Sequence, residues 1–456
     1  MTYMNALRGV RPSWRIRLRT TLDEPLAMLR LAVPIMLMAL VNMGMSVTDT
    51  IMISASFGAD ALAAVAVGSD FYSIHFYLGA GTIGGLVPFY AGAIAKGDHA
   101  GRARLERVGQ AMVLLLAAVL VPVVWTSPDL LGRVGLDQNL LDAGRGYTRL
   151  MALTLVPMLG VMLYRTILTA AERPKVFLYV TAAMLPLNAL GNHVLMHGFG
   201  PMPALGPTGA GASSLVAAMA SLVTLMAIAR KATPQTMPKA WIRLGDLGPV
   251  VRVGLPIGIA TVAELGIFLG ATLYAATLGA ADVAAHTLTL RIAGVAYAVP
   301  AALLQAAMVR MARAEAQADS DLNRQVIRSA LWLGTFAGTL LCLGLLAGAT
   351  PLSEAFFGDG SVGAAAAGSS VGLLFLLGVM ELVATPGTAT AGLLRGRKDT
   401  RAPMIYTLVG YWLIGAPLGL WLSEAWSLGI SGIWIGLTAG TTVTSALLIA
   451  RLVRAR

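Results

Sequence analysis

Carboxyl groups inside apolar stretches are the side chains of this sequence best suited to chemistry. Asp49 lies in the apolar run 29–60, and Glu264 lies in the run 251–282. Asp70 and Glu381 are two further acids in such surroundings. An acid at the centre of a membrane helix costs roughly 3 kcal/mol, so such groups are candidates for function. Because desolvation favours the neutral carboxyl, each acid could hold a proton and a cation alternately. The alternative is a neutral acid hydrogen-bonded between helices.

Two asparagines extend the first of these sites. Asn188 and Asn192 are four residues apart in the segment LPLNALGN, so a helix places them on one face. Together with Asp49, their amide oxygens could form an oxygen cage for Na⁺ or a hydrogen-bonded proton site. Alternatively, the two asparagines only hold helices together, each contributing about 1 kcal/mol.

A second group of residues could bind an organic cation. The segment SDFYSIHFY contains Asp70, Tyr72 and Tyr77, and an acid beside aromatic rings is the combination that attracts such a cation. Tyr77 follows Asp70 by seven residues and therefore shares its helix face. We take Asp70, Tyr72, Tyr77 and Arg291 as candidates for a substrate cavity, although aromatic residues are also common at membrane interfaces.

Several classes of chemistry are not supported. There is no P-loop, no HExxH and no GxSxG motif in a suitable setting, so nothing indicates ATP hydrolysis or peptidase activity. Cys342 is the only cysteine, which rules out a disulfide framework or a thiolate metal site. We expect no catalytic residues, no enzyme activity and no cofactor.

The elements that position these residues are membrane-spanning helices. Mean hydropathy is +0.75, 57% of the residues are hydrophobic and 12% are charged. Apolar runs of about 20 residues recur, the length that a helix needs to cross a bilayer. We predict an all-α polytopic membrane protein with spans at 27–53, 61–94, 109–127, 146–169, 175–197, 208–230, 248–275, 283–309, 327–349, 365–394, 403–422 and 429–451.

The net charge of +11 follows from this topology. Most Lys and Arg residues fall in the tails and in alternate loops, whereas the opposite loops hold only Arg133 and Arg145. Basic loops face the cytoplasm, so both termini are predicted to be cytoplasmic. The basic charge then indicates contact with anionic membrane lipids, not with nucleic acid.

The chain also repeats itself. A shift of 222 residues places Pro34 on Pro256 and Asp60 on Asp282. An even number of spans in each half requires parallel repeats, so the two six-helix lobes are predicted to be related by a pseudo-two-fold axis along the membrane normal. We divide the chain into a basic cytoplasmic tail, an N-lobe, a cytoplasmic linker and a C-lobe, at 1–25, 26–230, 231–246 and 247–456.

These features resemble the multidrug and toxic compound extrusion (MATE) family, in particular its bacterial NorM-like branch. The similarity rests on PIMLMALVNMGMSVTDTIMISASFGADALAAVAVGS in the first spans, on GLPIGIATVAELGIF in the seventh and on AGLLRGRKDTRAP before the eleventh. It covers nearly the whole chain. The resemblance implies a monomeric antiporter of a bacterial inner membrane, which exports organic cations in exchange for H⁺ or Na⁺ by alternating access of its lobes.

The resemblance also assigns residues. It implies a cation site at Asp49, Asn188, Asn192 and Ser214, where Na⁺ could bind to the first three, and an acid site of the C-lobe at Glu264. The family branch usually has an Asp in the tenth span where this chain has Ala384. Glu381, one turn earlier, could substitute for it. We therefore favour coupling through Asp49.

The sequence thus predicts a secondary antiporter for small organic, mostly cationic compounds. One alternative is a flippase or exporter of a lipid-linked or natural-product substrate in the same superfamily, which would be expected to carry a more cationic cavity. An integral membrane enzyme would need clustered polar residues at one membrane face, which we do not find. A passive channel would show no dependence on an ion gradient.

Overall fold

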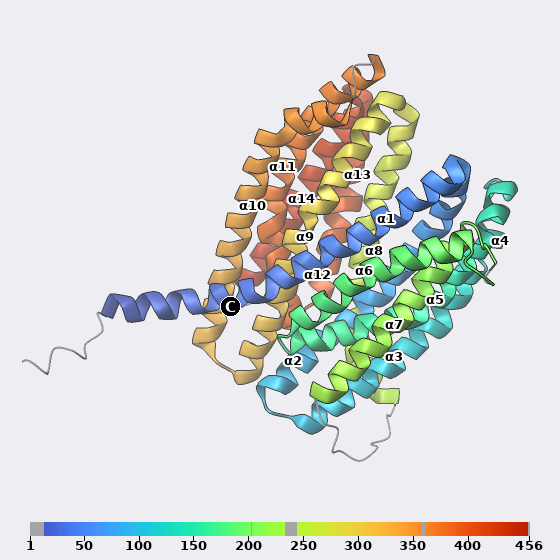
Figure 1. The fold of residues 1–456 in the computed structure, drawn as a ribbon. Coiled ribbons are helices and arrows are strands. Elements are labelled where there is room, and N and C mark those ends of the chain that lie inside the picture. The colour runs from blue at the N-terminus through green and yellow to red at the C-terminus, as the bar shows by residue number, and fades with distance from the viewer. Residues whose placement is uncertain (1–12, 202, 233–243, 358–360, 455–456) are drawn as a thin grey trace, which may run out of the picture.

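The computed structural model describes residues 13–201, 203–232, 244–357 and 361–454, nearly all of them in helices. Residues 1–12 of the predicted tail and 233–243 of the predicted linker lie outside the described residues. The elements are α1 (Ser13–Gly84), α2 (Val87–Ala95), α3 (His99–Trp125), α4 (Ser127–Val134), α5 (Gln138–Ala170), α6 (Pro174–His197), α7 (Thr208–Ala232), η1 (Leu244–Asp246), α8 (Leu247–Leu278), α9 (Ala280–Gln317), α10 (Ser320–Phe356), α11 (Ser361–Gly396), α12 (Arg401–Leu408), the π-helical segment η2 (Val409–Gly415), α13 (Ala416–Ala425) and α14 (Gly429–Arg454). The all-α prediction is confirmed (Figure 1).

The described residues contain enough helical segments for twelve membrane crossings. Ten helical stretches are long and apolar enough to cross a bilayer, and the first of them, Asp23–Ala95, folds back on itself and crosses twice. Helix α6 has 24 residues and is also long enough for a crossing. The helices thus agree with the predicted number of spans. The helices extend beyond the predicted apolar runs at most ends.

Two glycines make the turns that reverse the chain at equivalent points of the repeat. Gly58 divides α1 with φ 81° and ψ −175°, and Gly279 separates α8 from α9 with φ 130° and ψ 171°. This region of backbone space is open essentially only to glycine. Each turn therefore joins two antiparallel helices with hardly any loop, which keeps the first and second spans of each half close together.

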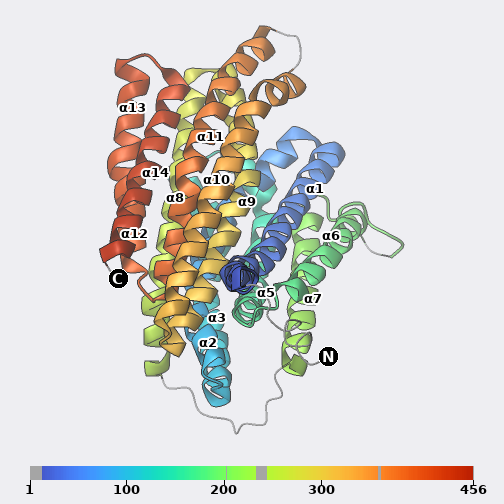
Figure 2. The ribbon, with the colours of Figure 1, turned by 90° about the vertical axis from the view of Figure 1, so that its left-hand side faces the viewer.

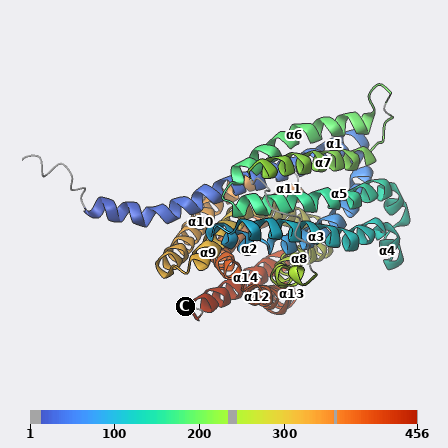
Figure 3. The same cartoon turned by 90° about the horizontal axis from the view of Figure 1, so that it is seen from below.

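The helices gather into two lobes (Figure 2). In the N-lobe, α3, α5 and α6 pack against α1, and α7 packs against α5 and α6. Helices α8 to α14 pack together in the C-lobe. Figure 3 shows α5 to α7 on one side of the molecule and α12 to α14 on the other. The first part of α1 crosses in front of α9, so the N-terminal segment also contacts the C-lobe (Figure 1).

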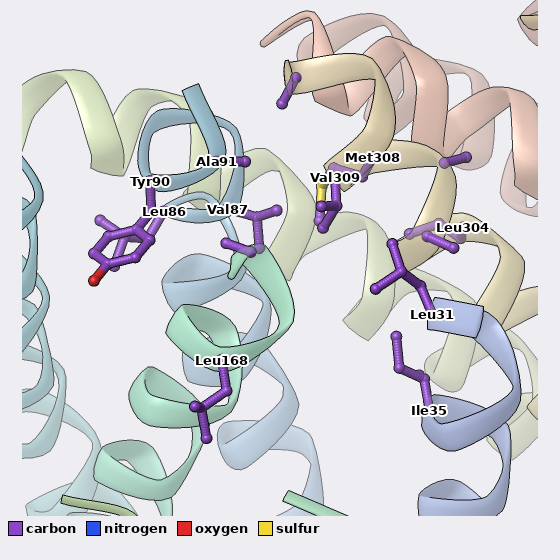
Figure 4. Packing of buried hydrophobic residues seen from close by; sticks show 14 of the residues in the cluster. Leu31, Ile35, Leu86, Val87, Tyr90, Ala91, Leu168, Leu304, Met308 and Val309 are labelled. Atoms are coloured by element: carbon purple, nitrogen blue, oxygen red, sulfur yellow. The ribbon is translucent and has the colours of Figure 1, made fainter. Parts of the chain in front are cut away.

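The packing of the lobes differs between the two ends of the molecule. We call one end the basic face, after the cationic helix ends at 96–107, 173–175, 310–328 and 395–401. Near this face a single apolar core contains residues of both lobes (Figure 4). At the opposite end the core is divided into one cluster in the C-lobe and another in the N-lobe. The lobes are thus joined at the basic face and packed separately beyond it.

A close backbone crossing lies within the shared core. A Cβ atom placed on Gly81 of α1 would come within 2.6 Å of Cα of Gly258 on α8. One turn away, Gly85 and Gly254 approach each other in the same way. Since any side chain here would separate the two helices, glycine is required for this contact between the lobes.

Candidate functional site

The predicted N-lobe site forms where α1 and α6 meet. Nδ2 of Asn192 donates a hydrogen bond to Oδ1 of Asp49 at 2.5 Å. Asn192 is fully buried, whereas Asp49 is half-buried. The two residues are 143 positions apart in the chain. The carboxylate therefore lies against a polar partner inside the N-lobe while part of it stays accessible.

Asn188 lies one turn before Asn192 and contacts α7. The hydroxyl of Ser213 donates to the backbone oxygen of Asn188 at 2.9 Å, and Nδ2 of Asn188 lies 3.5 Å from the same hydroxyl. The serine that packs against the site is thus the buried Ser213, not the predicted Ser214, which is half-buried. Neighbouring helix residues point about 100° apart, so only one of the two serines can face α6.

Two amide oxygens of this site have no hydrogen-bond partner. Oδ1 of Asn188 and Oδ1 of Asn192 are both buried and unsatisfied. An unpaired buried acceptor costs about 1–3 kcal/mol. Oxygen atoms are the ligands that Na⁺ accepts, and a protonated carboxyl could donate to one of them. The donor set of Asp49, Asn188 and Asn192 therefore fits either Na⁺ or a shared proton.

Tyr147 of α5 is a neighbour of this site that the sequence did not reveal. Its hydroxyl hydrogen-bonds Ser69, and its ring is 7% exposed in the N-lobe core. It lies within electrostatic range of both Asp49 and Asp70. A tyrosine among many apolar residues of a helix carries no spacing signal, so only the packing of α5 against α1 could show it.

The residues predicted to line a substrate cavity differ in their exposure. Asp70 of α1 and Arg291 of α9 are both exposed and lie within electrostatic range of each other across the two lobes. Tyr77 is 42% exposed and lies near Arg165. Tyr72, in contrast, is 8% exposed and belongs to the apolar core of the N-lobe. Two residues rotate a helical side chain by about 200°, so Tyr72 points away from Asp70 and into this core.

Arg165 is a second residue that the site prediction left out. It extends from α5 towards the C-lobe, where its Nη2 donates to Oε1 of Gln305 at 3.3 Å. Its guanidinium also lies 5.8 Å from the ring centroid of Phe177. A cation thus lies at the contact between the lobes, bonded across it to a neutral amide.

The two predicted acids of the C-lobe come together. Glu381 of α11 is 3% exposed and accepts a hydrogen bond from the hydroxyl of Thr385 at 3.0 Å. Glu264 of α8 hydrogen-bonds Tyr297 and lies within electrostatic range of both Glu381 and Arg395. The C-lobe therefore holds an acid pair with a nearby arginine.

A buried histidine completes the polar network of the C-lobe. The indole nitrogen of Trp434 donates to Nδ1 of His286 at 3.1 Å, so Nε2 of the neutral ring carries the proton. That nitrogen lies 3.0 Å from the hydroxyl of Thr272, which donates to the backbone oxygen of Phe268. His286 thereby links α8, α9 and α14 and has no free ring nitrogen.

Comparison with known proteins agrees with this architecture. The model of the MatE family matches residues 34–194 and 256–421, one segment in each half of the chain. The chain belongs to the MatE family. It is 32% identical to a probable multidrug resistance protein NorM of Bradyrhizobium diazoefficiens, over 94% of this chain and 93% of that protein. A probable NorM of Agrobacterium fabrum is 30% identical over the same shares.

Solved structures share the MatE fold at lower sequence identity. The eukaryotic MATE transporter AtDTX14 superposes with a TM-score of 0.84 at 17% identity, covering 95% of this chain and 96% of that one. At this identity the likeness shows the fold alone. The packing of α1 against α6, which brings Asp49 to Asn192, is thus part of a fold that other MATE proteins share.

Proposed function

We propose that this chain is a secondary antiporter, not an enzyme, which exports organic, mostly cationic compounds in exchange for H⁺ or Na⁺. The main support is the half-buried Asp49, hydrogen-bonded to Asn192 beside two unsatisfied amide oxygens. The relatives of this chain in Bradyrhizobium and Agrobacterium are named as probable multidrug resistance proteins, which fits such a role.

Coupling follows from competition for one charge. When Asp49 holds a proton or Na⁺, it cannot also neutralise an organic cation in the space between the lobes. Binding of one ligand therefore displaces the other, and this exclusion links the two fluxes. The oxygens of Asn188 and Asn192 would stabilise the ion-bound form. In the C-lobe, Glu264 and Glu381 would provide a second acid site. Glu381 would replace the Asp that the family branch usually has at the position of Ala384.

Alternating access fits the packing of the lobes. If the basic face is cytoplasmic, the shared core closes the cytoplasmic side and the divided cores leave the outer side free to separate. In this conformation a substrate would leave outwards. We further propose that the protein lies in a bacterial inner membrane, as a monomer with both termini in the cytoplasm and with no cofactor.

The experiment is dye export from proteoliposomes. Ethidium transport is measured under an imposed pH gradient and, separately, under an imposed Na⁺ gradient. Asp49→Asn is expected to reduce gradient-driven transport at least tenfold, whereas Asp60→Asn, which changes an exposed acid of the same helix, should leave it intact. If the Asp49→Asn variant transported ethidium at the wild-type rate, the role of Asp49 would be refuted. If the wild-type protein transported ethidium equally fast without either gradient, antiport would be refuted.

A second candidate is favoured by the cations between the lobes. Arg165 contacts Gln305 across the interface, and Arg291 is exposed opposite Asp70. Such groups would suit an anionic, lipid-linked or natural-product substrate. Competition of an anionic lipid-linked compound with ethidium distinguishes the two: displacement of the dye by the anion would favour this alternative, and displacement by organic cations alone would favour multidrug export.

A further inference from the structure

A cavity lies between the lobes at the basic face, separate from the acid sites. It has a volume of about 630 Å³ and contains none of the residues of either acid site. Half of its wall comes from α2 and α3 of the N-lobe. The other half comes from the start of α8 and the ends of α9 and α11 in the C-lobe. It is therefore complete only when the two lobes are together at this face.

The acidic side chains of this basic-face cavity are already engaged. Asp246 pairs with Arg104. Glu315 accepts a hydrogen bond from Nε of Arg397 at 2.7 Å. Asp98 caps α3 by accepting from the backbone nitrogen of Gly101 at 2.8 Å. The negative charge of the wall is thus neutralised or committed to the protein itself.

The cationic groups are in excess. Among the described residues, neither Lys96 nor Lys398 has an acid within ion-pair distance, and Nζ of Lys398 lies 4.3 Å from the ring centroid of Phe89. Nη1 of Arg397 is buried and has no hydrogen-bond partner. A buried guanidinium nitrogen without an acceptor is unfavourable, and an anion entering the cavity would supply one.

Two further features select the anion. The first turns of α3 and α8 both reach the cavity, at Gly101 and Pro249, and helix N-termini favour negative charge. Apolar side chains cover the rest of the wall, among them Phe89, Leu105 and Val250. A phosphate group attached to an organic body matches this combination of cations and apolar surface.

We propose that the basic-face cavity binds a phosphate-bearing ligand, either a lipid headgroup or a soluble phosphate compound, and that this ligand clamps the two lobes together. Because its wall is shared between the lobes, the ligand binds well only to the conformation closed at the basic face. Selective binding multiplies the ratio of closed to open molecules by 1 + [L]/Kd, which is about 11 at a ligand concentration of ten times Kd. The ligand is therefore an inhibitor of lobe movement, whichever ion drives transport.

The first test measures binding to the purified full-length protein in a neutral detergent. Three probes are titrated calorimetrically: dioctanoyl phosphatidylglycerol, inorganic phosphate and adenosine monophosphate, with dioctanoylglycerol as the phosphate-free control. We expect saturable binding of at least one phosphate probe. Loss of two charge-assisted contacts in the double variant Lys96→Gln, Lys398→Gln should weaken it at least tenfold. Lys175→Gln, an exposed lysine of the same face outside the cavity, should bind like the wild type.

The outcomes separate the sources of the phosphate. Binding of the phospholipid alone identifies a membrane lipid, and binding of phosphate or the nucleotide identifies a soluble ligand. The proposal is overturned if no phosphate probe saturates, if dioctanoylglycerol binds equally well, or if the double variant keeps the wild-type Kd.

The second test measures the clamp. Val87, which is 4% exposed in the core shared by the lobes, is replaced by cysteine in a Cys342→Ala background. Maleimide can reach this position only when the lobes part at the basic face. A saturating phosphate probe at ten times its Kd should slow labelling about elevenfold. An unchanged labelling rate with bound ligand would refute the clamp.

Discussion

Neutralising Glu24 should loosen the contact between the lobes at the basic face. Glu24, at the start of the first crossing in α1, forms two hydrogen bonds with Arg310 of α9, at 2.7 Å and 2.5 Å. Arg310 also donates to Glu172 of the α5–α6 turn at 2.8 Å, and Arg313 pairs with the same carboxylate. This cluster joins the C-lobe to two separate parts of the N-lobe.

The magnitude follows from the burial of the pair. The side chains of Glu24 and Arg310 are 6% and 17% exposed, so the pair is largely shielded from solvent. The variant Glu24→Gln keeps one oxygen acceptor but loses the charge and the second acceptor. Hydrogen bonds to charged groups contribute about 1.5–3 kcal/mol each. Once the lobes part, water solvates both groups, so this energy is lost mainly from the closed conformation. The ratio of closed to open molecules should fall by about 10- to 100-fold.

Maleimide labelling of Val87→Cys in membranes measures this ratio, because the cysteine reacts only in molecules open at the basic face. The rate should rise by the same 10- to 100-fold in Glu24→Gln. The matched control is Asp321→Asn, which breaks an exposed pair with Arg324 within α10 of the same face and should change nothing. An unchanged rate in a folded Glu24→Gln protein would refute the reasoning that this ion cluster holds the lobes together.

Three further predictions concern packing and charge. Gly258→Ala should lower the free energy of unfolding in detergent by about 1–3 kcal/mol, because its Cβ would lie 3.0 Å from a threonine hydroxyl and closer still to a backbone oxygen. Gly270→Ala, with open space around it, should leave the melting temperature unchanged. Equal melting temperatures of the two variants would contradict this prediction. His286→Phe should cost about 1–3 kcal/mol by the same assay, since it leaves a buried indole N–H unpaired. The hydrogen bond from Arg145 lowers the pKa of Asp129, so this contact persists at neutral pH and is lost only as the pH falls through that lowered pKa. Arg145→Gln should raise the pKa of Asp129 towards its ordinary value, which carbon NMR of the carboxyl group measures.

Features that repeat along one helix could be predicted from the sequence. Length and hydropathy determine how many times the chain crosses a bilayer, because a helix rises 1.5 Å per residue whatever it packs against. The four-residue spacing of Asn188 and Asn192 places them on one face for the same reason. The apolar setting of Asp49 singled it out as a site, since charges in such runs are costly.

Contacts between helices could not be predicted in this way. Whether Ser213 or Ser214 faces Asn188 depends on the rotation of α7 about its axis, and the burial of Tyr72 depends on how α1 packs in its lobe. The bond from Asn192 to Asp49 spans 143 residues, and that from Arg310 to Glu24 spans 286. Composition and periodicity describe each helix alone, whereas these pairings arise from the shape complementarity of whole faces. The sequence by itself determined a twice-repeated set of membrane helices with acids inside them, and only the tertiary structure decided which partners those acids have and at which face the lobes meet.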